Sequence, residues 1–322
     1  MSLVNLVILF LSSAVFCWII SVPIVWALKV FKIGQNIRQE GPSSHLMKAG
    51  TPTMGGISIL LTILVFTVIL LNIDIDPKYF GLIFLFLAYS ALGFADDLIK
   101  IRKRQNEGLT GRQKLFWQFI FAAIFASILI WKGHSSSVDG ILKLLYFNLP
   151  WLYFPFICFV VVGTSNAVNL SDGLDGLAAS TLAIAFTAFA AISYNLQAND
   201  PGIICAAAAG ATLAFLWFNV YPAEIFMGDI GSLGLGALLS GVAVILHKEL
   251  ALIIVGGVFF IEALSVIAQV LSYKAFKRRI FRMAPLHHHF ELLGMSEPLV
   301  VILSMIFGII FAVAGVWCST VL

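Results

Sequence analysis

Long apolar runs dominate this 322-residue sequence and limit what it can fold into. Ten stretches of mainly apolar residues are separated by short polar breaks, and about 20 apolar residues suffice for a helix to cross a bilayer. Hydrophobic residues make up 61% of the chain and charged residues 11%. Soluble domains contain roughly 45–50% apolar and about 25% charged residues. The apolar side chains of this chain are therefore too many to be buried in one core. We therefore expect an all-α, polytopic membrane protein of about ten transmembrane helices, with residues 1–322 forming one domain.

The polar breaks define the expected spans. The first run has no basic residue before it and no small-residue cleavage site after it, so we interpret it as a span and not as a cleaved signal. The segment 132–150 contains Asp139-Gly140 followed by alternating apolar residues, which predicts a small hairpin in one outer loop. The spans are expected at approximately 3–31, 53–72, 79–95, 114–131, 151–170, 176–195, 202–218, 231–247, 250–273 and 298–320.

The distribution of the 19 Lys and Arg residues predicts the orientation. If the N-terminus lies outside, four of them fall in outer segments: Lys78, Lys132, Lys143 and Lys248. The other 15 lie in or beside the first, second and fifth inner loops, which is the pattern of the positive-inside rule. We therefore expect both termini outside and the inner loops in the cytoplasm. The net charge of +3 gives no reason to expect a nucleic-acid partner.

Acidic residues gather at the predicted inner ends of the spans. A carboxylate at such a position is partly desolvated, which is unfavourable unless a cation compensates it. Five converging carboxylates would repel one another, and hard oxygen ligands beside a phosphate substrate favour Mg²⁺. The alternative is that each aspartate only caps a helix and faces water, which suits a single residue better than all five. The five are Asp96, Asp97, Asp172, Asp175 and Asp229.

The spacing of these residues adds detail. Asp96 and Asp97 are adjacent, so on a helix they point about 100° apart. We expect only one of them to face a reacting centre squarely, and the other to bind a metal ion or a basic side chain. Asp172 and Asp175 are three residues apart and would share a face if their segment were helical.

Asp229 stands between Gly228 and Gly231, at the start of a predicted helix. The N-terminal amides of a helix favour an anion. The following glycines, in GSLGLGA, do not follow a strand and do not form a dinucleotide fingerprint. Small-residue packing between membrane helices is the better interpretation of that run.

Three consecutive histidines lie in the segment PLHHHFE of the fifth inner loop. Three neighbouring side chains cannot all reach one zinc ion from a regular helix. Because arginines lie just upstream, we favour a cradle for phosphate or pyrophosphate. A solvated basic face would explain the arginines but not the histidines. The residues concerned are Arg278, Arg279, Arg282, His287, His288 and His289.

Glu262 lies in the middle of the ninth predicted span. An unpaired charge there costs roughly 2.5–3.5 kcal/mol on insertion scales, so we expect Glu262 to be protonated or paired. Gln269 lies on the same helical face, nearer the inside. This stripe could line a groove or hold two helices together, and the sequence leaves both open.

Four segments resemble the signature segments of the phospho-N-acetylmuramoyl-pentapeptide transferase family. They are GFADDLIK at 93–100, NAVNLSDGLDGLA at 166–178, MGDIGSLGLGA at 227–237 and APLHHHFE at 284–291. The aspartate motifs are also typical of the wider polyprenyl-phosphate N-acetylhexosamine-1-phosphate transferase superfamily. The histidine segment and GTPTMGG at 50–56 resemble the muramoyl-pentapeptide branch more specifically.

The resemblance implies a magnesium-dependent reaction at the bacterial cytoplasmic membrane. Undecaprenyl phosphate would attack UDP-N-acetylmuramoyl-pentapeptide, giving the lipid-linked diphospho-muramoyl-pentapeptide (lipid I) and UMP. The family's tendency to form dimers through membrane helices implies a homodimer. The active site would face the cytoplasm.

The resemblance also implies roles for individual residues. Asp229 matches the magnesium ligand, and Asp96 and Asp97 match the pair that handles the lipid phosphate, with Asp96 preferred as the base. Asp229, Asp96, Asp97 and His288 are the catalytic candidates. Phe226 would stack on uracil. The substrate-binding candidates are Lys48, Thr53, Lys114, Asn169, Asp172, Asp175, Asn219, Phe226, Gly228, Ser232, Gln269, His287 and His289.

Three other functions compete with this hypothesis. A sister enzyme acting on UDP-N-acetylglucosamine would share the aspartates but not the histidine segment. A secondary transporter would fit ten spans and glycine-rich helices, yet transporters place charged residues near the midplane, where this chain has only Glu262. A structural scaffold would leave the polar inner loops unexplained.

Overall fold

The structure is a computed structural model that describes residues 2–31, 48, 50–70, 76–103, 105, 107–138, 147–148 and 150–320. Most of the first inner loop and the predicted hairpin turn lie outside the described residues. So do four basic residues used above to predict orientation: Lys32, Arg38, Arg104 and Lys143.

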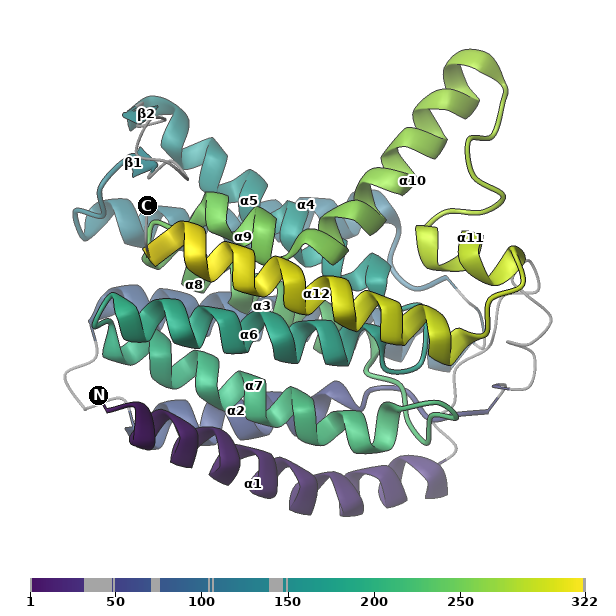
Figure 1. The fold of residues 1–322 in the computed structure, drawn as a ribbon, viewed down its shortest axis with the longest axis horizontal. Coiled ribbons are helices and arrows are strands. Elements are labelled where there is room, and N and C mark those ends of the chain that lie inside the picture. The colour runs from purple at the N-terminus through teal and green to yellow at the C-terminus, as the bar shows by residue number, and fades with distance from the viewer. Residues whose placement is uncertain are drawn as a thin grey trace.

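The described chain is almost entirely helical. Successive helices run back and forth along one bundle. The start of α1 and the described end of α12 lie at the same end of this bundle (Figure 1). The helices are α1 (Leu3–Val30), α2 (Gly56–Leu70), α3 (Pro77–Lys103), α4 (Gly111–Trp131), α5 (Pro150–Ser171), α6 (Leu177–Asn195), α7 (Asn199–Asn219), α8 (Gly228–Ile245), α9 (Glu249–Val255), α10 (Gly257–Phe276), α11 (Leu286–Leu292) and α12 (Glu297–Thr320).

These helices confirm the predicted all-α membrane fold. Nine helices of the described chain are long and apolar enough to span a membrane, and α2 is a shorter apolar helix of 15 residues. The ninth predicted span is divided at Gly256 into α9 and α10. Beyond this break α10 tilts away from the bundle (Figure 1). This pass is therefore not the single continuous helix that its apolar run predicts.

A small pair of strands confirms the predicted hairpin. Strand β1 (Ser137–Val138) pairs antiparallel with β2 (Phe147–Asn148), with Ser137 opposite Asn148. The turn between them, 139–146, lies outside the described residues.

Helix α8 lies at the centre of the bundle, because small residues let its neighbours approach closely. A Cβ on Gly93 of α3 would lie 2.1 Å from the Asp229 carbonyl oxygen. A Cβ on Gly236 would lie 2.7 Å from the Ser165 Cα of α5. The ends of α3, α5 and α8 that carry the conspicuous aspartates are thus packed together.

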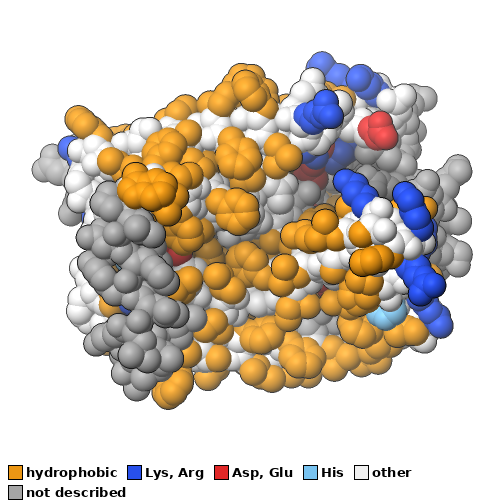
Figure 2. All heavy atoms as spheres, turned by 90° about the horizontal axis from the view of Figure 1, so that it is seen from above, with side chains coloured by type: hydrophobic (Ala, Val, Ile, Leu, Met, Phe, Trp, Pro, Cys, Tyr) orange, Lys and Arg blue, Asp and Glu red, His pale blue; other side chains and the backbone are white. Residues whose placement is uncertain are grey.

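The surface separates apolar from basic side chains. In Figure 2 hydrophobic side chains cover the length of the visible face, while most visible Lys and Arg gather at one end. That end carries α11 and the inner ends of α3 and α5. This distribution agrees with the basic inner loops expected from the positive-inside rule.

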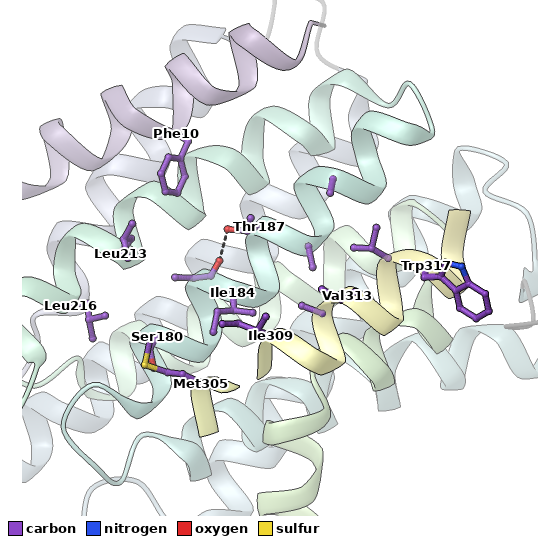
Figure 3. Close-up of a pocket in the computed structure, with 15 residues that line it drawn as sticks. Phe10, Ser180, Ile184, Thr187, Leu213, Leu216, Met305, Ile309, Val313 and Trp317 are labelled. Atoms are coloured by element: carbon purple, nitrogen blue, oxygen red, sulfur yellow. Dashed lines mark hydrogen bonds between the residues drawn. The ribbon is translucent and has the colours of Figure 1, made fainter. Parts of the chain in front are cut away.

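A cavity of about 630 Å³ opens between helices α6, α7 and α12, with Phe10 of α1 at its edge (Figure 3). Its lining is mainly apolar, including Ile184, Leu213, Ile309 and Trp317. None of the clustered aspartates lines it. The cavity is therefore distinct from the charged end of the bundle.

Candidate active site

Three carboxylates meet where α3 ends and α8 begins. Oxygen atoms of Asp96, Asp97 and Asp229 all lie within 4.8 Å of one another. Asp96 and Asp97 are buried, and Asp229 is partly buried. Both residues of the adjacent pair reach the cluster, and both contact a basic side chain, that of Lys100. Which of the two faces a reacting centre stays a prediction.

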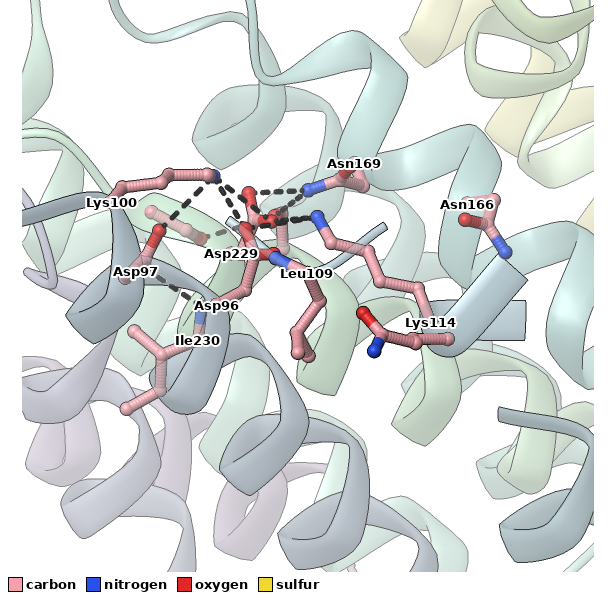
Figure 4. Close-up of polar contacts among 12 residues, drawn as sticks. Asp96, Asp97, Lys100, Leu109, Lys114, Asn166, Asn169, Asp229 and Ile230 are labelled. Carbon is pink, nitrogen blue, oxygen red and sulfur yellow. Dashed lines mark hydrogen bonds and ion pairs between the residues drawn. The ribbon is translucent and has the colours of Figure 1, made fainter. Parts of the chain in front are cut away.

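Two lysines neutralise most of this negative charge (Figure 4). Lys100 Nζ lies 2.7 Å from Asp96 Oδ2, 3.4 Å from Asp97 Oδ1 and 3.2 Å from Asp229 Oδ2. Lys114 Nζ of α4 lies 2.7 Å from Asp229 Oδ2 and 2.9 Å from Asp96 Oδ2. Three carboxylates thus share two ammonium groups, and oxygen atoms of all three lie close enough together to bind one cation.

Backbone and amide groups fix the orientation of the carboxylates. Leu109 N–H donates to Asp96 Oδ1 at 2.6 Å, and Ile230 N–H donates to Asp97 Oδ2 at 3.3 Å. Asn169 Nδ2 of α5 donates to Asp229 Oδ1 at 3.0 Å and to Ser232 Oγ at 2.8 Å. Asn169 and Ser232 thus lie at the cluster, as the sequence predicted.

The segment before α2 holds the start of α8 in place. Phe226 N–H donates to the Pro52 carbonyl, and Gly55 N–H donates back to the Phe226 carbonyl, both at 2.8 Å. This pairing places Thr53 beside Gly228, since a Cβ on Gly228 would lie 2.9 Å from Thr53 Oγ1 and 2.6 Å from Asp97 Oδ2. Gly228 has a φ of +76°, which glycine adopts readily.

The turn between α5 and α6, residues 172–176, is not helical. The condition under which Asp172 and Asp175 would share a helical face is therefore not met, and the two carboxylates have different neighbours. Burial and the nearby carboxylates of Asp229 and Asp97 raise the pKa of Asp172 well above its usual range. Asp172 thus belongs electrostatically to the aspartate cluster.

Asp175 belongs to a second charged cluster. Its Oδ1 accepts from Lys48 Nζ at 2.7 Å, and its Oδ2 accepts from Ala223 N–H at 3.0 Å. Lys48 also pairs with Glu297, the first residue of α12. Asn219 lies beside them and accepts from Gly176 N–H at 3.1 Å. The sequence-predicted Lys48, Asp175 and Asn219 are thus brought together.

The three histidines have three different partners. His287 is 1% exposed, and its Nδ1 lies 3.2 Å from Glu262 Oε2, which also accepts from the His287 N–H at 3.3 Å. Glu262 is therefore paired. The ring of His287 lies over Gly173, where an added Cβ would be 2.3 Å from Nε2. His287 thus connects α10 with the turn that carries Asp172.

The other two histidines interact within their own loop. His288 Nδ1 lies 2.9 Å from Glu291 Oε2, and His289 Nδ1 accepts from Arg282 N–H at 3.1 Å. Gln269 accepts from the N–H groups of Ile280 and Phe281. Of the two roles left open for the Glu262–Gln269 stripe, the structure favours holding elements together, because both side chains bind the loop that follows α10.

Two charged residues in these clusters were not among the sequence-predicted site residues. Lys100 follows Asp96 by four residues and Asp97 by three, and this helical spacing could have identified it. Glu297 is an acidic residue just before an apolar run, which resembles an ordinary helix start. No local pattern links it to Lys48, from which it is separated by 249 residues.

The sequence is similar to those of known proteins over most of its length. The glycosyl transferase family 4 model matches residues 79–247, and phospho-N-acetylmuramoyl-pentapeptide-transferase signature 1 matches residues 48–60. Proteins named phospho-N-acetylmuramoyl-pentapeptide-transferase from Bacillus pumilus (strain SAFR-032) and Bacillus subtilis (strain 168) are 47% identical over 292 residues. One from Geobacillus kaustophilus (strain HTA426) is 48% identical over 297 residues. Each alignment covers 90% of both chains.

The helical membrane fold and its acidic, lysine-bridged end define an integral-membrane glycosyl transferase of family 4. Within that class, the chain belongs to the phospho-N-acetylmuramoyl-pentapeptide-transferase family.

Proposed function

We propose that the protein transfers phospho-N-acetylmuramoyl-pentapeptide from its UDP-activated form to undecaprenyl phosphate. A phosphate oxygen of the lipid attacks the β-phosphorus, the bridging P–O bond to the α-phosphate breaks, and UMP leaves. The products are lipid I and UMP. The observation that carries this proposal is the Asp96–Asp97–Asp229 cluster with its two lysines, in a chain 47% identical to transferases of that name.

Magnesium is the cofactor that this cluster fits best. Its three carboxylates offer hard oxygen donors within 4.8 Å of one another. Mg²⁺ typically binds one or two carboxylates together with substrate phosphates and water. Asp229 is the preferred ligand because Asn169 already orients its carboxylate. The chemistry that a bound Mg²⁺ supplies is charge neutralisation at the pyrophosphate.

The residues around the cluster suggest how the lipid phosphate is handled. A phosphate monoester has a second pKa near 6, so its attacking oxygen is largely ionised at neutral pH. Asp96 and Asp97 therefore act mainly by holding Lys100 and Lys114 where they meet the incoming phosphates. Asp96 remains the preferred base for the protonated fraction of the lipid phosphate. His288 is assigned to the reacting diphosphate by family resemblance.

The second cluster provides the nucleoside end of the site. Lys48 and Asn219 lie beside Asp175 of the 172–176 turn, and Phe226 lies in the α7–α8 connection that follows Asn219. Phe226 would stack on uracil. Thr53, Gly228, Asp172, His287 and His289 are assigned to the sugar and diphosphate that must lie between the two clusters, and Gln269 supports their loop.

We place the protein in the bacterial cytoplasmic membrane with this site facing the cytoplasm. Both clusters adjoin the predicted inner loops that carry most of the basic residues, which the positive-inside rule assigns to the cytoplasm. A homodimer formed through membrane helices is proposed by analogy with the family. Cross-linking in native membranes tests the dimer, and cysteine labelling of α1 and α12 ends from outside tests the orientation.

Substrate choice is tested by supplying both nucleotides to the purified protein in the presence of undecaprenyl phosphate and Mg²⁺. Release of UMP from UDP-N-acetylmuramoyl-pentapeptide is expected. Release from UDP-N-acetylglucosamine alone would identify the sister enzyme instead. Reconstituted vesicles that accumulate intact nucleotide without releasing UMP would identify a transporter.

A further inference from the structure

Glu297 is a buried carboxylate that joins the last membrane helix to the second charged cluster. It is the first residue of α12 and is 7% exposed. Its Oε1 accepts from Asp175 N–H at 2.7 Å and pairs with Lys48 Nζ. The side chain of Lys48 is itself 14% exposed. One lysine is thus shared by two carboxylates, from Glu297 and Asp175.

These contacts leave Asp175 with little freedom. Its N–H donates to the Glu297 carboxylate. Its Oδ1 accepts from Lys48 Nζ, and its Oδ2 accepts from Ala223 N–H. The next residue, Gly176, is held by Asn219. The turn that carries Asp172 and Asp175 is therefore fixed from α12 on one side and from the α7–α8 connection on the other.

The direction of the Glu297 carboxylate argues against a simple helix cap. A carboxylate at a helix start is favoured by the helix dipole, an effect worth roughly 0.3–1 kcal/mol. Here Oε1 contacts the N–H of Asp175 and the ammonium of Lys48, both outside α12. Charge-assisted hydrogen bonds of this kind fix geometry more strongly than neutral ones.

We propose that Glu297 is a positioning residue for the nucleoside end of the UDP-substrate, acting through Lys48 and Asp175. This inference rests on the proposed function. Glu297 orders Lys48 and the 172–176 turn before the nucleotide binds. The free energy of binding is therefore not reduced by the cost of ordering them. Because this ordering is used equally in the bound substrate and in the transition state, its loss raises KM and leaves kcat nearly unchanged.

The test compares the wild-type protein with Glu297→Gln, which keeps an acceptor for Asp175 N–H and removes the charge that pairs with Lys48. The control is Glu224→Gln, whose carboxylate pairs with Lys29 at 2.7 Å but is exposed. For Glu297→Gln we expect the KM for the UDP-substrate and the Kd for UMP to rise about tenfold, which corresponds to about 1.4 kcal/mol. We expect kcat and the KM for the lipid to change less than about twofold, and the control to match wild type.

A double-mutant cycle with Lys48→Gln tests the route of the effect. If Glu297 acts through Lys48, Glu297→Gln adds little to the Kd for UMP once Lys48 is replaced. Full additivity would overturn that route. An unchanged Kd for UMP, with only a lower thermal midpoint, would make Glu297 a structural anchor and overturn the inference. If the wild type binds no UMP, the proposed function itself fails, which is a different result.

Discussion

Lys114 on α4 and Asp229 on α8 lie 2.7 Å apart, Nζ to Oδ2, although they are separated by 115 residues in the sequence. The same ammonium group reaches Asp96 on α3 at 2.9 Å. One lysine therefore holds three helices at the charged end of the bundle. Lys100 contacts the same carboxylates, so two lysines connect the acidic residues of α3 and α8.

Replacing Asp96 by Asn should impair the chemical step more than nucleotide binding. The change removes the negative charge between Lys100 and Lys114, on the lipid-phosphate side of the proposed site. We expect kcat to fall roughly a hundredfold, within the range for a positioned acid–base group, with the KM for the UDP-substrate changed much less. Steady-state kinetics with each substrate varied measures both.

The matched control for this change is Asp76→Asn, just before the opposite end of α3, where the exposed carboxylate pairs with Lys78. It should behave as wild type. A variant Asp96→Asn that mainly weakened affinity for the UDP-substrate would remove Asp96 from the lipid-phosphate side.

Phe226→Ala should weaken nucleotide binding with less effect on turnover. Stacking of a base on an aromatic ring is worth roughly 1–3 kcal/mol, so we expect the KM for the UDP-substrate to rise at least about fivefold. Loss of binding that is equal in ground and transition states leaves kcat little changed. Phe276→Ala, at the exposed inner end of α10, is the control. A large fall in kcat at unchanged KM would contradict the stacking role.

Gly93→Ala should destabilise the fold itself. The added methyl group would lie 2.1 Å from the Asp229 carbonyl oxygen, so α3 and α8 would have to separate. Overpacking of this kind typically costs about 1–3 kcal/mol, and it would also displace the aspartate cluster. We expect a lower thermal midpoint in detergent and loss of activity.

Gly163→Ala provides the comparison, since Gly163 lies within α5 and nothing is within 4 Å of its added Cβ. That variant should be neutral or more stable by up to about 1 kcal/mol, as expected for Gly to Ala in a helix. Equal midpoints for the two variants would argue against close packing of α3 on α8.

The pH dependence of stability should report on His134 at the opposite end of the bundle. Burial and neighbouring His247 lower the pKa of His134 to about 4, against an unfolded value near 6.5. As the pH falls from 6.5 towards 4, the unfolded chain binds a proton that the folded protein does not. The free energy of unfolding should therefore fall over this window, by up to about 3 kcal/mol.

His134→Phe keeps a ring to stack on His247, whose centroid is 4.0 Å away, and cannot titrate. Its thermal midpoint should be lower at pH 7.5, because the contacts of Nε2 with Tyr153 and Val244 are lost. Between pH 6.5 and 4 its midpoint should vary less than that of the wild type. Parallel pH profiles would show that His134 does not cause the dependence.

The membrane fold could be predicted from sequence because each apolar run is a local signal. The break at Gly256 was not predicted, although Gly256 and Gly257 interrupt the run 250–273, because adjacent glycines also occur within continuous membrane helices, where they allow close packing. The aspartates were identifiable because carboxylates at the ends of apolar helices are unusual. Their division into two clusters depends on the non-helical 172–176 turn, which no spacing rule predicts.

The contacts between distant residues explain what sequence reasoning missed. Glu262 was recognised as unusual, but its partner His287 is 25 residues away and follows a loop of unpredictable path. Glu297 and Lys48 meet only because α12 begins where the first inner loop ends. Such contacts depend on tertiary packing. Local sequence patterns can therefore identify the unusual residues but cannot predict which of them are in contact.

The most direct test of the proposed reaction is UMP release by wild type and Asp229→Ala, each with and without Mg²⁺. Both substrates are supplied, and lipid I is measured in the same samples. We predict equal amounts of UMP and lipid I from the wild type with Mg²⁺, and neither product after chelation. Asp229→Ala should lose at least about a hundredfold in turnover, as expected when a group that stabilises developing charge is removed. Near-normal, Mg²⁺-dependent turnover by Asp229→Ala would contradict the assignment of the metal to this cluster.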